Sequence, residues 1–238
     1  MKYSIIIPCY NEEKNLPELV KRLLPIRDAY PVEFILVENG SRDQSRRYFK
    51  EQIEGKYPQI ETVYVDQNQG YGYGIQQGLQ AAGGEYLGWL HADMQSRPED
   101  LAAFFKEIER HSPEEKLFLK AHRTNRSPYE LVFTYGQAVF TSVLFQRLMT
   151  DVAAVPFLFS RAMLDEIPIQ SMPNDFSIDI FIYWQAVRLH YTVIRPTVEI
   201  QQRKHGTSSW NRGLRSRIRT SRRIMRSSIQ IRRGKKVL

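Results

Sequence analysis

Cysteine is almost absent from the sequence: Cys9 is its one thiol, so no disulfide can form within the chain. Because small secreted domains depend on disulfides, this absence excludes a disulfide-stabilised scaffold and favours a reducing compartment. Long apolar runs are also lacking. The run at Ser4–Pro8 is too short for a signal peptide, and no stretch approaches the ~20 apolar residues that cross a bilayer. We therefore expect a soluble or peripheral protein.

Acidic residues are absent after Glu199, whereas 13 of the 34 lysine and arginine residues lie between Arg203 and Lys236. The chain before this tail keeps 21 basic and all 26 acidic residues, so its net charge is −5. The formal charge of +8 therefore describes an acidic body with a basic tail. With 42% hydrophobic residues the chain can build a substantial core, and we expect one domain over 1–210 and a tail over 211–238.

Strand-like and helix-like segments alternate through the first half of the sequence. Apolar or β-branched runs predict strands, and apolar residues at helical spacing predict helices between them. The expected strands are Ser4–Pro8, Val32–Glu38, Thr62–Val65, Tyr86–Leu90 and Leu117–Leu119, and the expected helices are Glu13–Leu24, Asp43–Ile53, Tyr71–Ala82 and Pro98–Ile108. This rhythm predicts an α/β fold with a mostly parallel central sheet and helices on both faces.

The second half is less regular. Tyr129–Met149 and Phe176–Leu189 predict helices, Val155–Phe159 predicts a strand, and Tyr191–Ile200 predicts a strand interrupted by Pro196. The tail predicts a basic amphipathic C-terminal helix whose apolar face is formed by Leu214, Ile218, Met225 and Ile229. Such a helix suits an anionic bilayer surface, where each basic side chain contributes roughly 1 kcal/mol.

Polar segments follow four of the expected strands. They are Pro8–Glu13, Val37–Asp43, Asn68–Gly74 and His91–Gln95. Ligands bind at the carboxyl ends of the strands in parallel sheets, so we expect these segments to form one pocket. Its side chains can stack on a base, hydrogen-bond a ribose and hold a cation.

Asp93 and Gln95 are the candidate metal ligands in the last of these segments. At a strand end, residues two apart point to the same side. Their carboxylate and amide oxygens are hard ligands for Mg²⁺ or Mn²⁺, with a diphosphate and water completing the coordination. The metal would neutralise the diphosphate of a departing nucleotide.

Taken in order, these segments resemble the motifs of family 2 glycosyltransferases, which have the Rossmann-like GT-A fold. Pro8–Glu12 is similar to the opening P-x-Y-N-E of that family, Val37–Asp43 to its V-D-D-G-S-x-D segment, and Asn68–Gly78 to its N-x-G-x-G stretch. His91–Gln95 resembles D-A-D-x-Q, and Arg203–Ser208 resembles R-x-x-G-x-S. Within the family, the chain resembles polyprenyl-phosphate sugar transferases and dolichol-phosphate mannosyltransferase-like enzymes.

The resemblance implies a nucleotide-sugar donor and a Mg²⁺ or Mn²⁺ cofactor. The residues implied to bind the nucleotide-sugar are Pro8, Tyr10, Glu12, Glu38, Asp93, Arg123 and Arg203, and those implied to hold the metal are Asp93 and Gln95. Guanidinium groups suit phosphate oxygens, which agrees with the role of both arginines.

Two departures from the family motifs leave questions open. His91 stands where the first acid of D-A-D is usual, so one carboxylate near the metal is missing. Glu38-Asn39 stands where two aspartates are usual, which leaves the identity of the base open.

A sugar hydroxyl acceptor needs a general base, whereas a polyprenyl phosphate is already anionic. Asp179 is the first candidate base and Asp175 the second, because residues one helical turn apart can face one site. In related enzymes a carboxylate often stands two residues beyond Asp179, where this chain has Phe181. Asp151 matches a family aspartate near the acceptor site and is a weaker candidate.

We therefore expect an inverting, metal-dependent glycosyltransferase that moves a sugar to a lipid-linked acceptor, either a saccharide hydroxyl or a polyprenyl phosphate, in cell-surface glycan biosynthesis. The basic tail is expected to hold it on the cytoplasmic face of the membrane. Two alternatives stay open. One is a catalytically weak family member that binds a nucleotide-sugar or scaffolds a complex, and His91 and Phe181 motivate it. The other is a nucleic-acid-binding protein using the arginine-rich tail, which the acidic body disfavours.

Overall fold

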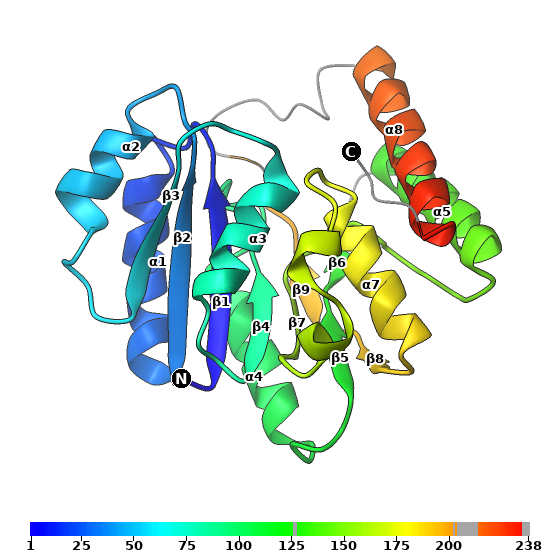
Figure 1. The fold of residues 1–238 in the computed structure, drawn as a ribbon, viewed down its shortest axis with the longest axis horizontal. Helices are drawn as coiled ribbons and strands as arrows, with labels where there is room; N and C mark the ends of the chain where they lie inside the picture. The colour runs from blue at the N-terminus through cyan, green and yellow to red at the C-terminus, as the bar shows by residue number, and fades with distance from the viewer. Residues whose placement is uncertain (126–127, 202, 204–213, 235–238) are drawn as a thin grey trace.

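A computed structural model describes the backbone of residues 1–125, 128–201, 203 and 214–234. Within these ranges, seven strands form one sheet in the order β3-β2-β1-β4-β7-β5-β8 (Figure 1). Their bounds are β1 Tyr3–Cys9, β2 Val32–Asn39, β3 Ile60–Val65, β4 Tyr86–Trp89, β5 Leu117–Lys120, β7 Phe157–Ser160 and β8 Thr192–Ile194. Strands β1 to β4 are parallel, and β7 runs antiparallel to β4 and β5. A small parallel sheet pairs β6 (His122–Thr124) with β9 (Thr197–Glu199).

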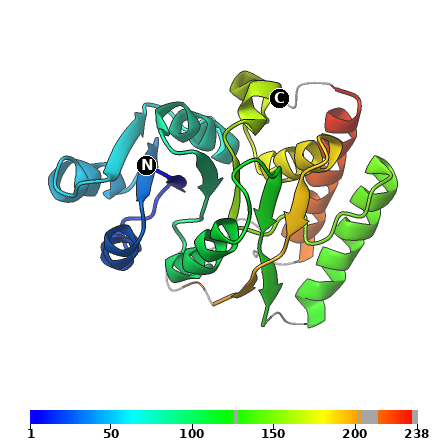
Figure 2. The ribbon, with the colours of Figure 1, turned by 90° about the horizontal axis from the view of Figure 1, so that it is seen from below.

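Helices cover both faces of the large sheet (Figure 2). The helices on one face are α1 (Leu16–Ala29), α2 (Ser45–Tyr48) with the π-helical η1 (Phe49–Ile53), and α4 (Leu101–Glu109) preceded by the 3-10 turn η2 (Pro98–Asp100). Those on the other face are α3 (Tyr71–Ala81), α5 (Pro128–Phe145), α7 (Ile178–Arg188) and α8 (Leu214–Arg232), with α6 (Met163–Glu166) and η3 (Ile169–Ser171) in the connection before α7.

The central strands are buried on both sides, which explains their continuous apolar sequence. Every residue of β1 and β2 is buried, so their alternate side chains enter two separate cores. Ile5 and Ile7 belong to the core under α1 and α4. Ile6 belongs to the opposite core, together with Ile75 and Leu79 of α3.

The predicted α/β architecture, with a mostly parallel sheet and helices on both faces, is confirmed. The predicted break at Pro196 in the strand segment Tyr191–Ile200 is confirmed: two strands form there, and β8 joins the large sheet whereas β9 joins the small one. Pro196 separates them, since proline has no N–H to donate to a ladder. Its carbonyl instead accepts a hydrogen bond from His122 N at 2.8 Å. The expected boundary between 210 and 211 lies outside the described residues.

The tail forms helix α8, which lies beside α5 and α7 (Figures 1 and 2). Ser227 and Ile231 are buried against the protein. Of the predicted apolar face, Ile218 and Met225 are 40% and 39% exposed, and the side chain of Leu214 lies outside those described. No helix in the described part of the chain is long and apolar enough to cross a membrane. Contact of α8 with a membrane surface stays a prediction.

The loop that precedes α7 packs directly on the start of α3. A Cβ atom at Gly70 would lie 2.2 Å from the carbonyl oxygen of Asn174, and one at Gly72 would lie 2.1 Å from that of Pro173. Tyr73 N donates a hydrogen bond to Asn174 O at 3.1 Å. The two glycines therefore allow direct backbone contact between segments about a hundred residues apart.

We predict that Gly72→Ala destabilises the protein by roughly 1–3 kcal/mol, because the added methyl group must push the loop away from α3. For a chain of this size, each kcal/mol lowers Tm by roughly 2–4 °C. The control is Gly136→Ala in α5, where the added Cβ meets nothing within 4 Å and a gain of up to ~1 kcal/mol is expected. Thermal melts compare the two variants, and equal losses of Tm would contradict the contact.

Candidate active site

The carboxyl ends of β1, β2, β3 and β4 lie at one edge of the sheet, because these strands are parallel neighbours. Each strand is followed by a turn that contains one residue with positive φ: Asn11 at 57°, Gly40 at 70°, Gly70 at 119° and Met94 at 63°. This conformation is uncommon for methionine, and such residues cluster at functional sites. The four polar segments are thereby presented at the same edge, as the sequence predicts.

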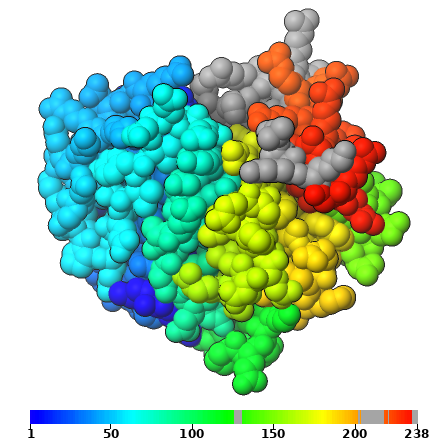
Figure 3. Space-filling model, viewed as in Figure 1, coloured from blue at the N-terminus to red at the C-terminus, as the bar shows by residue number. Residues whose placement is uncertain are grey.

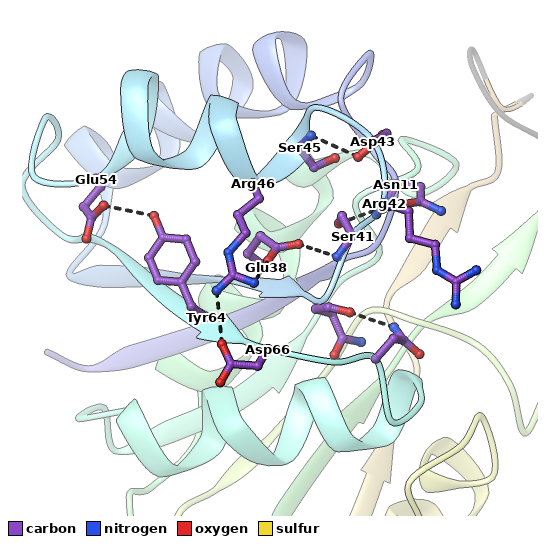
Figure 4. Close-up of polar contacts among 12 residues, drawn as sticks. Asn11, Glu38, Ser41, Arg42, Asp43, Ser45, Arg46, Glu54, Tyr64 and Asp66 are labelled. Atoms are coloured by element: carbon purple, nitrogen blue, oxygen red, sulfur yellow. Dashed lines mark hydrogen bonds and ion pairs between the residues drawn. The ribbon is translucent and has the colours of Figure 1, made fainter.

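Hydrogen bonds join the turns after β1 and β2 (Figure 4). Asn11 N donates to Ser41 Oγ at 3.1 Å, and Arg42 N donates to Asn11 Oδ1 at 2.8 Å. Beside these bonds Pro8 is buried, whereas Tyr10 is 39% exposed. The Tyr10 ring is therefore accessible for stacking on a base.

Glu38 is the buried acid at this edge of the sheet (Figure 4). Its Oε1 accepts a hydrogen bond from Ser41 N at 2.7 Å, and Arg46 Nη1 lies 3.7 Å from its Oε2. Among the residues that the structure describes, none donates a hydrogen bond to the buried Oε2. Since a buried acceptor that receives no hydrogen bond costs free energy, a ligand N–H or O–H that reached Oε2 would be stabilised there.

Asp93 lies in the turn after β4 and is 3% exposed. Its Oδ1 accepts a hydrogen bond from Gln95 N at 3.0 Å, and its Oδ2 forms an ion pair with Arg203 Nη2. His91 Nδ1 lies 4.0 Å from the same Oδ2. The prediction that strand alternation aligns Asp93 and Gln95 is wrong, because β4 ends at Trp89. The turn and its hydrogen bond hold the two residues together instead.

Glu12 belongs to the same charged group. Its Oε2 accepts a hydrogen bond from Asn15 Nδ2 at 2.5 Å. Burial raises the pKa of Glu12, and the nearby Asp93 carboxylate adds to the rise while Arg203 opposes it. The structure thus brings together three of the residues implied to bind the donor, Glu12, Asp93 and Arg203.

The residues at this edge fit a divalent cation that arrives with a diphosphate. Within the described ranges, no group of three or more histidine, cysteine, aspartate or glutamate side chains is arranged to hold a metal by itself. Mg²⁺ commonly uses one or two protein carboxylates and completes its shell with substrate phosphates and water. The buried Asp93 carboxylate and the Gln95 amide match that set, and Arg203 shows that the carboxylate accepts a cationic partner.

The two candidate bases have different surroundings. Asp179, in the first turn of α7, is 3% exposed and accepts a hydrogen bond from Trp89 Nε1 at 2.9 Å. Burial raises its pKa, while the nearby His91 and Lys120 oppose the rise. Asp175 accepts a hydrogen bond from Ser177 N and pairs with Arg223 Nε, each at 2.9 Å. The expectation that one helical turn aligns both acids is wrong, because Asp175 precedes the helix.

Arg123 lies in β6 and forms an ion pair with Asp151, the weaker acceptor-site candidate. Its Nε lies 3.1 and 3.0 Å from the two carboxylate oxygens. The side chains are 18% and 11% exposed, so the pair is partly shielded from water. Contact between Arg123 and a donor diphosphate stays a prediction.

An aromatic connection that sequence reasoning misses joins this edge to the loop before α7. Tyr71 Oη lies 2.8 Å from His91 Nε2, and the Tyr71 ring stacks on Phe176 with 4.7 Å between centroids. His91, which replaces an acid of the family motif, is therefore fixed by α3. The sequence feature that could have indicated this contact is a tyrosine between Gly70 and Gly72.

Lys120 is a second residue that sequence reasoning misses. It is fully buried at the end of β5, donates a hydrogen bond to Ala154 O at 2.6 Å, and lies 5.1 Å from the centroid of the Phe157 ring. Burial lowers its pKa to about 7, while Asp179 opposes the shift. The sequence feature that could have indicated this buried residue is a single lysine at the end of an apolar strand.

Residues 4–166 match the family described as Glycosyl transferase family 2. This match covers more than half of the chain, and the chain therefore belongs to glycosyl transferase family 2. Curated relatives include the undecaprenyl-phosphate 4-deoxy-4-formamido-L-arabinose transferases of Pectobacterium atrosepticum, 37% identical over 100 residues, and of Pseudomonas fluorescens, 35% identical over 100 residues. Each match covers 41% of this chain, and it spans 31% and 29%, respectively, of the relatives.

Solved structures show the same fold. Glucosyl-3-phosphoglycerate synthase from Mycobacterium tuberculosis, in complex with Mn²⁺, UDP and glucosyl-3-phosphoglycerate, superimposes with a TM-score of 0.75 at 16% identity. The superposition covers 98% of this chain and 80% of that chain. A complex of the same enzyme with Mg²⁺ and UDP gives a TM-score of 0.72 at 16% identity over the same shares of the two chains. The predicted family and GT-A fold are confirmed.

We predict that Lys120 makes the free energy of unfolding rise with pH above about 7, by up to ~1.4 kcal/mol per pH unit. An unfolded lysine keeps its proton up to its usual pKa of 10.5, whereas buried Lys120 releases it near 7. The unfolded state therefore binds more protons between these values. Lys120→Met removes this contribution. Urea unfolding at pH 7 and pH 9 measures both proteins, and an equal pH dependence would contradict the lowered pKa.

Proposed function

We propose that this protein transfers a sugar from a nucleotide-sugar to a lipid-linked acceptor, with inversion at the anomeric carbon and with Mg²⁺ or Mn²⁺ as cofactor. The observation that carries the proposal is the buried Asp93 carboxylate, which pairs with Arg203 and is hydrogen-bonded to Gln95 at the carboxyl edge of the parallel strands. A carboxylate, an amide and a guanidinium at one point suit a metal-bound diphosphate.

In this proposal the nucleoside lies at the turns after β1 and β2. Pro8 and Tyr10 contact the base, because the Tyr10 ring is exposed beside the buried proline. Glu12 and Glu38 supply acceptors for ribose or base donors, and the Oε2 of Glu38, to which none of the described residues donates a hydrogen bond, supports that role. Pro8 and Glu38 lie near the ends of the neighbouring strands β1 and β2, and Tyr10 and Glu12 follow β1, so a single nucleoside can contact all four residues.

The diphosphate lies at the turn after β4. Asp93 and Gln95 would hold the Mg²⁺ or Mn²⁺ ion, which neutralises charge on the departing diphosphate when bound. Arg203 and Arg123 contact the phosphate oxygens, for which a guanidinium fork is well matched. The Mn²⁺ and UDP in the Mycobacterium tuberculosis synthase complex support a metal-assisted nucleotide donor for this chain.

The transfer breaks the bond between the anomeric carbon and the diphosphate oxygen, and the nucleoside diphosphate leaves with the bonding electrons. The acceptor oxygen forms the new bond from the opposite side. When that oxygen belongs to a hydroxyl group, its proton passes to a base, and buried Asp179 is the better candidate because Asp175 already pairs with Arg223. An anionic phosphate oxygen needs no base.

A lipid-linked acceptor and a place at the membrane surface complete the proposal. The relatives named as undecaprenyl-phosphate sugar transferases support such an acceptor. Exposed arginines of α8 attract anionic lipids, and α5 exposes an apolar side formed by Val132, Tyr135, Val139 and Val143. We place the protein peripherally on the cytoplasmic face, where it contributes to cell-surface glycan biosynthesis.

We predict that one nucleoside diphosphate among UDP, GDP, CDP and dTDP raises Tm only when Mn²⁺ is present. Binding at a ligand concentration of 100 times Kd stabilises the folded protein by about 2.7 kcal/mol, which is a shift of roughly 5–10 °C for this chain size. Asp93→Ala abolishes the shift, because it removes the carboxylate that holds the metal. Differential scanning fluorimetry of the wild-type protein and of Asp93→Ala measures the shift in Tm.

The control for that experiment is Asp28→Ala, which removes an exposed carboxylate of α1 that pairs with the neighbouring Arg27. This variant should keep the full nucleotide shift. If no nucleotide shifts Tm with any metal, the donor site is refuted and a scaffold role gains support. If the shift survives in Asp93→Ala, the nucleotide binds elsewhere.

We predict that Asp179→Asn lowers kcat for donor hydrolysis by water by about 10²–10⁴-fold, because water, like a sugar hydroxyl, must give up a proton. The donor KM should change little, since the hydrogen-bond partner of Asp179 is Trp89 in β4 and not a residue implied to bind the nucleotide. Asp175→Asn is the matched comparison. A larger loss of kcat in Asp175→Asn than in Asp179→Asn would make Asp175 the general base. Full activity in both variants would show that neither residue acts as a general base.

A further inference from the structure

No ligand is assigned above to a groove between α8 and the loop before α7, although Asp175, the second candidate base, lines it. Its volume is about 680 Å³, which falls in the range of roughly 300–1,000 Å³ typical of small-molecule sites. The residues that define it are Arg219, Arg222, Arg223, Arg226, Ile218 and Asp175. We call it the arginine groove. Figure 3 shows α8, in orange and red, beside the yellow segment that leads into α7.

The arginine groove concentrates positive charge. Arg219 comes three and four residues before the adjacent pair Arg222 and Arg223, and Arg226 comes four and three residues after them. The four arginines therefore lie on one side of α8, and all are exposed. Arg223 pairs with Asp175 at 2.9 Å. Of the carboxylates in the described residues, none lies within 4.0 Å of the other three arginines. Like charges at this spacing repel, so an anion bound between them would be stabilised.

The chemistry of the arginine groove favours a phosphate monoester. Four guanidinium groups and one carboxylate leave three positive charges in excess. A phosphate monoester carries about −1.5 to −2 charge at neutral pH and offers three acceptor oxygens, whereas a carboxylate carries a single charge. Guanidinium forks bind phosphate oxygens in pairs, which an ammonium group cannot do.

The arginine groove is connected to the donor edge through a short series of contacts. Asp175 on its wall is followed by Phe176, which stacks on Tyr71. Tyr71 is hydrogen-bonded to His91, and His91 Nδ1 lies 4.0 Å from the Asp93 carboxylate. A molecule in the groove is therefore beside the candidate base Asp175, on the α7 side of the donor site.

We infer that the arginine groove binds the phosphate group of a phosphomonoester acceptor. The inference rests on the proposed function, because it names the acceptor class of that same site. The phosphate can belong to a lipid headgroup or to a water-soluble molecule, since both present the same group to the arginines. Neutral glycans without a phosphate bind weakly in comparison.

The test compares two double variants with equal loss of charge. Arg222→Gln/Arg226→Gln removes two groove arginines, whereas Arg232→Gln/Arg233→Gln removes two exposed arginines at the carboxyl end of α8, outside the groove. The probes are phosphatidylcholine vesicles that contain farnesyl phosphate, farnesol or phosphatidylglycerol, together with free glycerol 3-phosphate. Vesicle co-sedimentation and calorimetry give Kd for the full-length chain.

We expect the groove variant to bind farnesyl phosphate vesicles at least tenfold more weakly than wild type, and the control variant to stay within about twofold. Farnesol vesicles should bind neither protein appreciably. Arg219→Lys keeps the positive charge but loses the guanidinium group that can bind two phosphate oxygens at once. We therefore expect its Kd to lie between those of the wild type and the groove variant. If glycerol 3-phosphate binds and the groove variant weakens this binding, the phosphate belongs to a water-soluble molecule. If farnesyl phosphate binds and glycerol 3-phosphate does not, the phosphate belongs to a lipid headgroup.

Equal losses in both double variants, or equal binding to phosphatidylglycerol vesicles, would overturn the inference in favour of general attraction to a charged surface. Groove-dependent binding of a single-stranded oligonucleotide that exceeds phosphomonoester binding would overturn it in favour of nucleic acid. Both double variants should keep the Mn²⁺-dependent nucleotide shift. If that shift is absent in wild type while groove-dependent phosphate binding persists, the proposed transfer fails and the phosphate site stands.

Discussion

The backbone contact between the start of α3 and the loop before α7 is the constraint on which the arrangement of the site depends. Gly70 and Gly72 let the carbonyl groups of residues 173–175 approach to distances at which any side chain would collide. This contact fixes Phe176 against Tyr71, and Tyr71 in turn reaches His91 at the donor edge. The segment that carries both candidate bases is thereby held beside the segment that carries the candidate metal ligands.

Pairing of aspartates with arginines is the second recurring feature. Three aspartates that the sequence singles out each have an arginine partner, and the pairs are Asp93 with Arg203, Asp151 with Arg123, and Asp175 with Arg223. A substrate phosphate competes for the guanidinium groups of such pairs, since it is also anionic and accepts two hydrogen bonds at once. Substrate binding would then replace the aspartate partner of an arginine by a substrate phosphate, with the arginine already in position.

Much of the fold could be predicted because it depends on local periodicity. Strands β1 and β2 and helix α3 lie where their apolar patterns place them, and the family motifs locate the edge at which their polar turns meet. The end of helix α1 is harder to predict: the expected helix ends at Leu24, just before Pro25, yet the helix continues to Ala29. The position of Asp175, the pairing of Arg123 and the burial of Lys120 depend on contacts between distant segments, which spacing along the chain does not encode.

The proposed chemistry depends above all on Asp93, which must hold a metal ion together with the donor diphosphate. A crystal structure with Mn²⁺ and the nucleotide that gives the largest thermal shift tests this role directly, because anomalous scattering locates manganese without ambiguity. We predict an anomalous peak within about 2.0–2.6 Å of an Asp93 carboxylate oxygen, bridged to the diphosphate, with Arg203 moved onto the phosphates. A peak remote from Asp93, or a bound diphosphate held without metal while the Asp93–Arg203 pair stays intact, would contradict that role.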